Sequence, residues 1–254
     1  SWLHIALRLH YQLLAGDVGM IVAGITGLLL FVLSLTGIVL WPGWRKLIAG
    51  FKIKWNAHPK RRNFDIHKVT GVIVAVFLAF TGFTGFCWNF YDWSSSFIYA
   101  ITLTPKPAEL ESKPLAGKSA LPIAEILQVA DSIFPDSTTT YVGVPSKLNG
   151  VVRVGKRQAY ESSRYGESEV LVDPYTGKAL RVQNSKTLGL GDRILNSFAP
   201  LHYGTFWGVL SRILYVFVGL APLILLITGF VMWRYRKQKS GSLATLAQEL
   251  DLHR

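Results

Sequence analysis

Three stretches of the 254-residue chain, residues 18–41, 69–88 and 213–233, are apolar and contain no charged residue. A membrane-spanning helix needs about 20 such residues to cross about 30 Å of hydrocarbon. Each stretch ends in tryptophan, which is enriched at the membrane–water interface. The sequence therefore predicts a membrane α-helical fold with three transmembrane helices, and the lipid bilayer is the first expected partner.

The charges predict how these helices are oriented. The net charge is +12, yet the segment 94–200 is nearly balanced, with twelve basic and ten acidic residues. The segment 42–64 carries seven Lys or Arg and no acidic residue, and the segment 234–239 carries four more. Short loops rich in Lys and Arg stay in the cytoplasm. We therefore expect these two segments inside and the central region outside, and we expect no nucleic-acid partner.

The central region has the pattern of a small α+β domain. Four prolines between residues 105 and 122 indicate an extended linker, and residues 123–133 have apolar side chains at helical spacing. Short β-branched segments follow at 138–144, 150–156, 169–172 and 178–182. The region contains no histidine and no motif for a nucleophile, a phosphate or a metal. We predict one helix packed on an antiparallel sheet.

An internal repeat relates the first and third apolar stretches. Leu-His-Tyr at 9–11 recurs at 201–203, and Thr-Gly-x-Val-x-Trp at 36–41 recurs at 228–233, so the offset is 192 at both ends. Both helices run from outside to inside. The repeat therefore predicts that His10 and His202 lie at the same depth, near the outer face.

Two histidines at matched depth can hold a metal macrocycle between them. Imidazole is a common metal ligand, and haem iron takes two axial ligands. We therefore consider His10 and His202 candidate axial ligands of a low-spin haem b; no Cys-x-x-Cys-His motif for covalent attachment is present. The alternative is that both Leu-His-Tyr motifs are ordinary interface anchors in a duplicated helix.

Other residues near the histidine pair are candidates for cofactor binding. Tyr11 and Tyr203 could line the macrocycle, and Arg8 and Arg212 could pair with haem propionates. The alternative for both arginines is snorkelling to lipid headgroups. His67 lies at the inner start of the second apolar stretch, and no partner for it is visible in the sequence.

The remaining histidines and the single cysteine are weaker candidates. His4 could replace His10 as a ligand if the register differs, whereas His58 is expected to be solvated and His253 to be uninvolved. Cys87 cannot form an intrachain disulfide and is expected to be a packing residue. Glycines of the Thr-Gly pairs at 81–82 and 84–85 are expected to mark helix contacts.

Several motifs together resemble the PepSY-associated transmembrane proteins of bacterial inner membranes, over essentially the whole chain. They are LHYQLLAGDVG with a helix ending in TGIVLWP, DIHKVTG, VLVDPYTGKAL, and LHYGTFWG leading into TGFVMWRYRK. The best-described members are similar to siderophore reductases of the ferrioxamine type. The resemblance implies four helices, PepSY-like periplasmic domains and b haems held by histidine pairs.

Carried to this sequence, the resemblance implies that His10 and His202 hold a periplasmic-side haem. His67 matches the inner histidine, whose partner comes from the first helix of the family. Because the sequence starts at Ser1 on the outer side, we expect that helix and the first periplasmic domain to lie upstream. One haem is expected, and two in a full-length protein.

The expected organisation follows from these observations. It comprises a juxtamembrane segment and transmembrane helix at 1–41, a basic cytoplasmic loop at 42–64, a transmembrane helix at 65–92, a periplasmic PepSY-like domain at 93–195, a juxtamembrane segment and transmembrane helix at 196–236, and a cytoplasmic tail at 237–254. The expected location is the bacterial inner membrane.

The expected function is an oxidoreductase that reduces ferric siderophore iron in the periplasm. No nicotinamide or flavin fingerprint occurs, so the electron donor is expected to be another cytoplasmic protein or quinol. One alternative is a non-enzymatic, membrane-anchored module that binds a periplasmic protein or peptide. Another is electron delivery to a different periplasmic acceptor.

Overall fold

The computed structural model describes residues 1–115, 117, 119–161 and 165–252, with side chains described up to residue 238. His253 lies outside the described residues. The chain divides into two compact units: a helical unit, Ser1–Phe90 with Leu201–Arg254, and a central unit, Tyr91–Pro200. This division lies close to the predicted limits 93–195 of the central domain.

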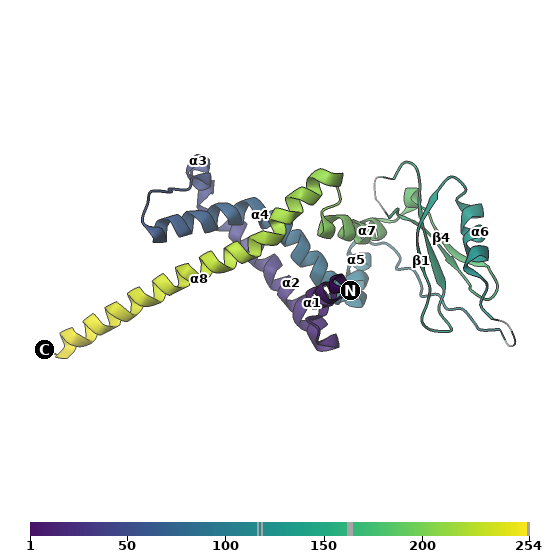
Figure 1. Ribbon diagram of the computed structural model, residues 1–254, viewed down its shortest axis with the longest axis horizontal. Coiled ribbons are helices and arrows are strands. Elements are labelled where there is room, and N and C mark those ends of the chain that lie inside the picture. Colours follow the sequence, from purple (N-terminus) through teal and green to yellow (C-terminus); the bar gives the residue numbers. More distant parts are fainter. Residues whose placement is uncertain (116, 118, 162–164, 253–254) are drawn as a thin grey trace. The chain divides into compact units, whose positions relative to one another are not determined.

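Three helices of the helical unit are long and apolar enough to cross a membrane, which confirms the predicted class: α2 (Gly16–Val39), α4 (Pro59–Asn89) and α8 (Gly208–Leu252) (Figure 1). Helix α4 begins well before the apolar stretch at 69–88. Pro59 occupies its first position, where the missing N–H costs nothing, and the ring of His58 accepts a hydrogen bond from Lys60 N.

Close contact between α2 and α4 depends on two glycines that face each other. A Cβ placed on Gly27 would lie 2.8 Å from the carbonyl oxygen of Gly82, and a Cβ on Gly82 would lie 2.7 Å from that of Gly27. Small residues of this kind let membrane helices approach closely. On α4, Val74 and Leu78 pack against Val218 and Ala221 of α8, so α4 contacts both other helices.

The internal repeat is visible in the backbone. Two helices that carry the Leu-His-Tyr motifs, α1 (Trp2–Gln12) and α7 (Leu190–Tyr203), precede α2 and α8 respectively. Gly16 and Gly208, which are 192 residues apart, each begin the long helix with positive φ, 56° and 61°. Glycine adopts this left-handed conformation at little cost, so both long helices begin in the same way. The links before them differ, because positive φ occurs at Leu13 and Leu14 in the first copy and at Gly204 in the second.

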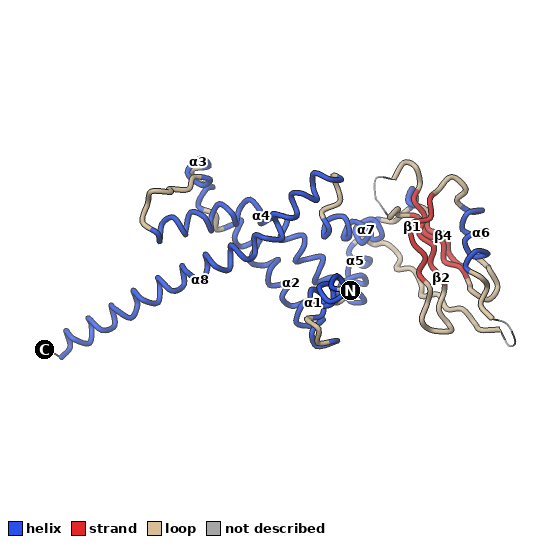
Figure 2. The backbone as a smooth tube through the Cα atoms, viewed as in Figure 1, coloured by secondary structure: helices blue, strands red, loops and turns tan. Residues whose placement is uncertain are grey.

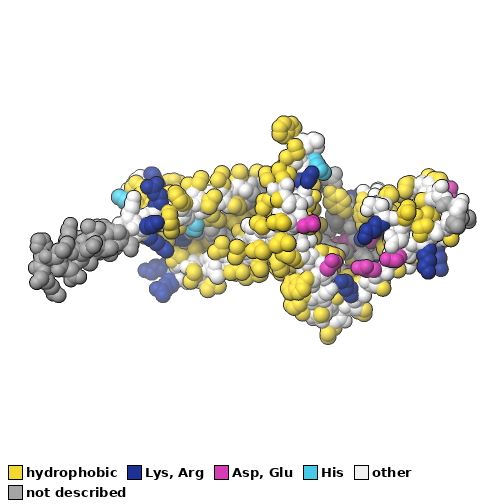
Figure 3. Space-filling model, turned by 90° about the horizontal axis from the view of Figure 1, so that it is seen from below, with side chains coloured by type: hydrophobic (Ala, Val, Ile, Leu, Met, Phe, Trp, Pro, Cys, Tyr) yellow, Lys and Arg dark blue, Asp and Glu magenta, His cyan; other side chains and the backbone are white. Residues whose placement is uncertain are grey.

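The basic loop after α2 contains η1 (Pro42–Trp44) and α3 (Leu47–Phe51) and is held onto α4 by a buried carboxylate. Asp65, fully buried, accepts from Lys68 Nζ at 3.1 Å, from Arg61 Nε at 3.2 Å and from Lys54 N at 3.2 Å. Lys68 also donates to the carbonyl of Ala49 at 3.1 Å. Figure 3 shows hydrophobic side chains covering the helical unit and Lys and Arg gathered near the end from which α8 extends.

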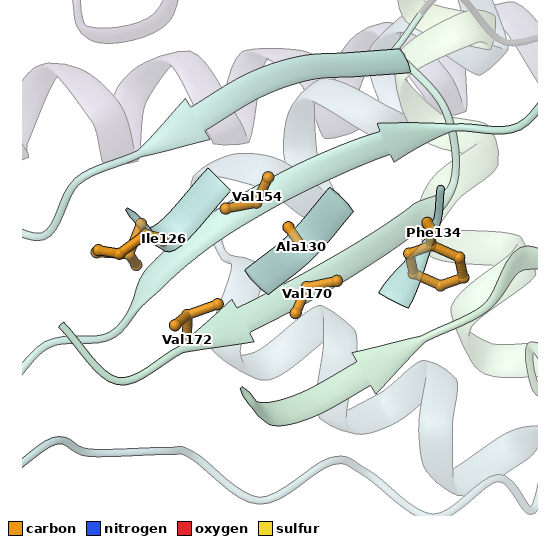
Figure 4. Close-up of a cluster of buried hydrophobic side chains, with 7 residues drawn as sticks. Ile126, Ala130, Phe134, Val154, Val170 and Val172 are labelled. Atoms are coloured by element: carbon orange, nitrogen blue, oxygen red, sulfur yellow. The ribbon is translucent and has the colours of Figure 1, made fainter. Parts of the chain in front are cut away.

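The central unit is a four-stranded antiparallel sheet with one covering helix (Figures 2 and 4). The strands, in spatial and sequence order, are β1 (Thr138–Gly143), β2 (Val152–Arg157), β3 (Ser168–Val172) and β4 (Ala179–Gln183). Helix α6 (Ile123–Ile133) places Ile126 and Ala130 against Val154, Val170 and Val172. These five side chains form the buried centre of the domain.

The predicted α+β domain is therefore confirmed, and its elements match closely. Helix α6 has the predicted bounds 123–133, and every strand begins within two residues of its predicted start. Helix α5 (Tyr91–Ile101), η2 (Ser185–Thr187) and the beginning of α7 were not predicted. A run of three serines interrupts the apolar pattern of α5, and Pro200 lies inside α7.

Substitution of Gly27 tests the contact between α2 and α4. We expect Gly27→Ala to destabilise the purified protein by about 1–3 kcal/mol, because the added methyl group meets backbone atoms that cannot move aside. Gly37→Ala is the matched control on the same helix, since a Cβ there has open space. Thermal unfolding in detergent measures both; equal melting temperatures would contradict the packing described.

The core of the central unit is tested by a second matched pair. Ile126, fully buried, loses packing on substitution with alanine, and we expect a cost of about 2–5 kcal/mol. Ile123 lies on the same helix but is 39% exposed, so Ile123→Ala should cost much less. The rate of tryptic cleavage within residues 91–200 of the intact protein measures the difference, and similar rates would show that α6 is not docked as described.

Candidate functional site

The helical unit contains a cavity of about 680 Å³ lined by α1, α2, α4, α7 and α8. Its walls are mainly apolar, with Met20, Leu30 and Leu78 among them. Glycines at 27, 82, 85 and 219 also line it and leave room between the helices. A largely apolar cavity with a few polar groups is typical of a small-molecule or cofactor site.

His10 and His202 face this cavity, each in the last turn of its short helix. Their ring centroids are 6.0 Å apart, with an angle of 69° between the ring planes. A metal ion between two imidazoles lies about 2 Å from each nitrogen, which places the ring centres about 6 Å apart. The structure thus brings together the two histidines related by the repeat, at a separation that fits one metal atom.

The ring of His202 is held by α4. Its Nδ1 lies 2.8 Å from Thr84 Oγ1, and its centroid lies 4.8 Å from that of Trp88. Burial, together with the nearby His10, lowers the pKa of His202 to about 4. The imidazole is therefore neutral at physiological pH, which is the form that binds metals.

The other residues predicted for this site separate into two groups. Tyr11 and Tyr203 line the cavity, and the ring of Tyr203 lies 5.6 Å from that of Trp88. Arg8 and Arg212 are exposed and are not among the cavity-lining residues. The two roles considered for the arginines, with a bound group or with lipid headgroups, thus stay predictions.

His67 lies elsewhere, in the N-terminal part of α4, and does not line the cavity. The structure gives it a partner that the sequence did not indicate: its Nδ1 lies 2.8 Å from Thr228 Oγ1 of α8. A Cβ on the neighbouring Gly229 would lie 3.6 Å from the Cε1 atom of His67. His67 therefore has surroundings like those of His202, at a different position.

Thr84, Trp88 and Thr228 are the site residues that sequence reasoning missed. The available signal was the Thr-Gly dipeptide, which we expected to mark helix contacts. That expectation holds for Gly82, which packs on Gly27, but Gly85 instead faces His202, whose Cε1 would lie 3.4 Å from a Cβ at this position. Cys87 is buried, as expected for a packing residue.

The residues around the cavity are compatible with a metal macrocycle. Among the described residues, no cluster of three or more His, Cys, Asp or Glu side chains could hold a metal ion. A macrocycle supplies its own equatorial ligands and needs only two axial groups from the protein. The histidine pair and the apolar cavity fit such a group.

The central unit has a separate, polar cleft of about 490 Å³. Glu169, nearly buried, accepts from Arg153 Nε at 2.8 Å, from Arg153 Nη2 at 3.0 Å and from Tyr141 Oη at 2.7 Å. Asp192 accepts from Tyr99 Oη at 2.6 Å. These carboxylates already have strong partners, and the cleft differs in kind from the apolar cavity.

Three apolar helices, a histidine pair between them and a small α+β domain define an integral membrane protein. The family described as PepSY-associated TM region matches residues 1–236, and the chain belongs to this family. No curated protein matches it significantly. The resemblance seen in the sequence is thus confirmed at the level of the family, and the siderophore reductase activity stays a prediction.

Proposed function

We propose that this protein is a haem-b-containing oxidoreductase of the bacterial inner membrane that reduces ferric siderophore iron in the periplasm. The observation that carries the proposal is the 6.0 Å separation of the His10 and His202 rings across an apolar cavity. Both histidines end the short helices that precede α2 and α8, and an ionisable residue that faces the interior of a membrane helix bundle often marks a functional site. The resemblance to siderophore reductases supplies the substrate.

The chain's own residues would hold the haem by its iron and by its faces. His10 and His202 would hold the iron, and Tyr11, Tyr203 and Trp88 would provide aromatic contacts with the bound group. A bound haem would supply a one-electron couple that reduces the ferric iron to the ferrous form, which a siderophore holds poorly. The mainly apolar walls would exclude water and influence the potential.

Charge supports the membrane orientation that this proposal needs. The basic loop at 42–64 and the four Lys and Arg residues at 234–239 of α8 favour the cytoplasmic side. The histidine pair lies at the opposite end of α8, which is the periplasmic side in this orientation. Electrons would come from a cytoplasmic protein or quinol, and His67 is the candidate ligand of a second haem.

A second candidate function rests on the polar cleft of the central unit. There the protein would be a non-enzymatic membrane anchor, and the cleft would bind a periplasmic protein or peptide through groups such as Arg153 and Tyr141. This candidate needs no haem. Visible absorption of the purified protein separates the two.

Haem binding is tested with histidine variants. The purified protein should show the sharp reduced bands of a low-spin haem b, with about one haem per chain for the outer site. His10→Ala and His202→Ala should each abolish that haem, because each removes an axial ligand. His4→Ala is the control: His4 is exposed on the same helix as His10 and is not among the cavity-lining residues. Unchanged haem content in both ligand variants would overturn the assignment.

Substrate identity needs a separate measurement. Reduced protein, mixed rapidly with a ferric hydroxamate siderophore such as ferrioxamine, should be reoxidised, with one ferrous iron trapped for each electron lost. His202→Ala should lose this reaction. Reoxidation by other acceptors but not by the ferric siderophore would leave the haem assignment intact and favour a different periplasmic acceptor.

A further inference from the structure

Two Thr-Gly dipeptides in the membrane helices hold histidine rings in the same way. We infer that Thr84-Gly85 and Thr228-Gly229 are histidine seats, pairs that fix the tautomer and position of His202 and His67 so that Nε2 is left to bind iron. The role toward iron rests on the proposed function, whereas the tautomer is a property of the protein alone.

The tautomer of His202 follows from the hydrogen bonds of Thr84. The Thr84 hydroxyl donates its single proton to the carbonyl of Phe80, 2.7 Å away. Its contact with His202 Nδ1, at 2.8 Å, therefore has to use an oxygen lone pair, so Nδ1 carries the proton. In a neutral imidazole the other nitrogen, Nε2, is then unprotonated and free to coordinate a metal.

Thr228 repeats this arrangement for His67. Its hydroxyl donates to the carbonyl of Ile224 at 2.7 Å and lies 2.8 Å from His67 Nδ1. The proton of His67 is thus also placed on Nδ1. Both seats use a carbonyl four residues earlier in the same helix, a bond that threonine commonly makes in helices.

The glycine of each seat leaves space for the edge of the ring. A Cβ on Gly85 would lie 3.4 Å from Cε1 of His202, and a Cβ on Gly229 would lie 3.6 Å from Cε1 of His67. A Cβ at either glycine would thus be in ordinary van der Waals contact with the ring edge, so the glycine lies beside the imidazole while the threonine hydroxyl fixes its orientation. The dipeptide alone does not make a seat, because Gly82 of Thr81-Gly82 packs on Gly27 instead.

The two seats link three helices. Helix α4 carries the seat for His202 of α7 and also carries His67, while α8 carries the seat for His67. His67 and Thr84 are 17 residues apart, so His67 and the seat for His202 lie about 25 Å apart along α4. Such hydrogen bonds to ligating histidines orient the ring and raise its basicity, and their loss costs about 10–100-fold in metal affinity.

The decisive experiment compares Thr84→Val, which loses the hydroxyl, with Thr84→Ser, which keeps it. We expect Thr84→Val to lose haem about 10–100-fold more readily and to have a more positive midpoint potential, because a less basic ligand stabilises ferric iron less. Thr84→Ser should restore both values. Thr36→Val is the matched control, since Thr36 donates to Val32 O at 2.9 Å in the same manner but is exposed on α2.

A haem-independent readout keeps the inference separate from the proposed function. Nitrogen-15 NMR of labelled histidine in the haem-free protein should show the Nδ1–H tautomer for His202, and a weaker preference for it in Thr84→Val, where the ring keeps its backbone partner at Thr81. Thr228→Val should do the same for His67 alone. Wild-type protein with this tautomer but no haem would contradict the proposed function and support the seats. An Nε2–H tautomer in the wild type, or a potential unchanged in Thr84→Val, would overturn the inference.

Discussion

Polar groups buried between membrane helices need partners within the protein, because hydrocarbon offers none. In this chain α4 provides such partners at several positions along its length. Asp65 binds the basic loop, His67 binds Thr228 of α8, and Thr84 binds His202 of α7. Asn89, at the end of α4, donates to the carbonyl of Met20 on α2 at 2.9 Å. The packing of the unit therefore depends on α4 more than on any property of the two repeated helices.

This dependence explains where the cavity lies. Gly27 and Gly82 bring α2 and α4 into backbone contact, whereas α8 packs on α4 through larger side chains such as Leu78 and Val218. The helices are therefore unequally spaced, and glycines at 85 and 219 leave further room toward the histidine pair. The cavity is a consequence of this spacing, and His10 and His202 reach it from the short helices that precede α2 and α8.

Much of this structure could be predicted from sequence, and the reasons differ between elements. The length of the apolar stretches predicted the three long helices, and the spacing of apolar residues predicted α6. Both patterns are visible in the sequence because they follow from which side chains must face lipid or the protein core. The repeat predicted that His10 and His202 lie together. It could not predict Thr84 or Thr228, since the partner of a side chain depends on how each helix is rotated about its axis. Helices that are apolar on every side carry little information on that rotation.

The two copies of the repeat make different contacts, although their sequences are similar. Both contribute a histidine to the apolar cavity, but His10 is exposed, whereas His202 is half-buried and lies 2.8 Å from Thr84 Oγ1. Toward the other end of the two helices, Thr228 Oγ1 lies 2.8 Å from His67 Nδ1, whereas its counterpart Thr36 is exposed, and a Cβ on Gly37 would meet no described atom within 4 Å. The difference arises because α4 presents His67 to α8 and Gly82 to α2. The two related helices, α2 and α8, therefore have different roles, because they contact different side chains of α4: α2 packs on Gly82, and α8 contacts His67.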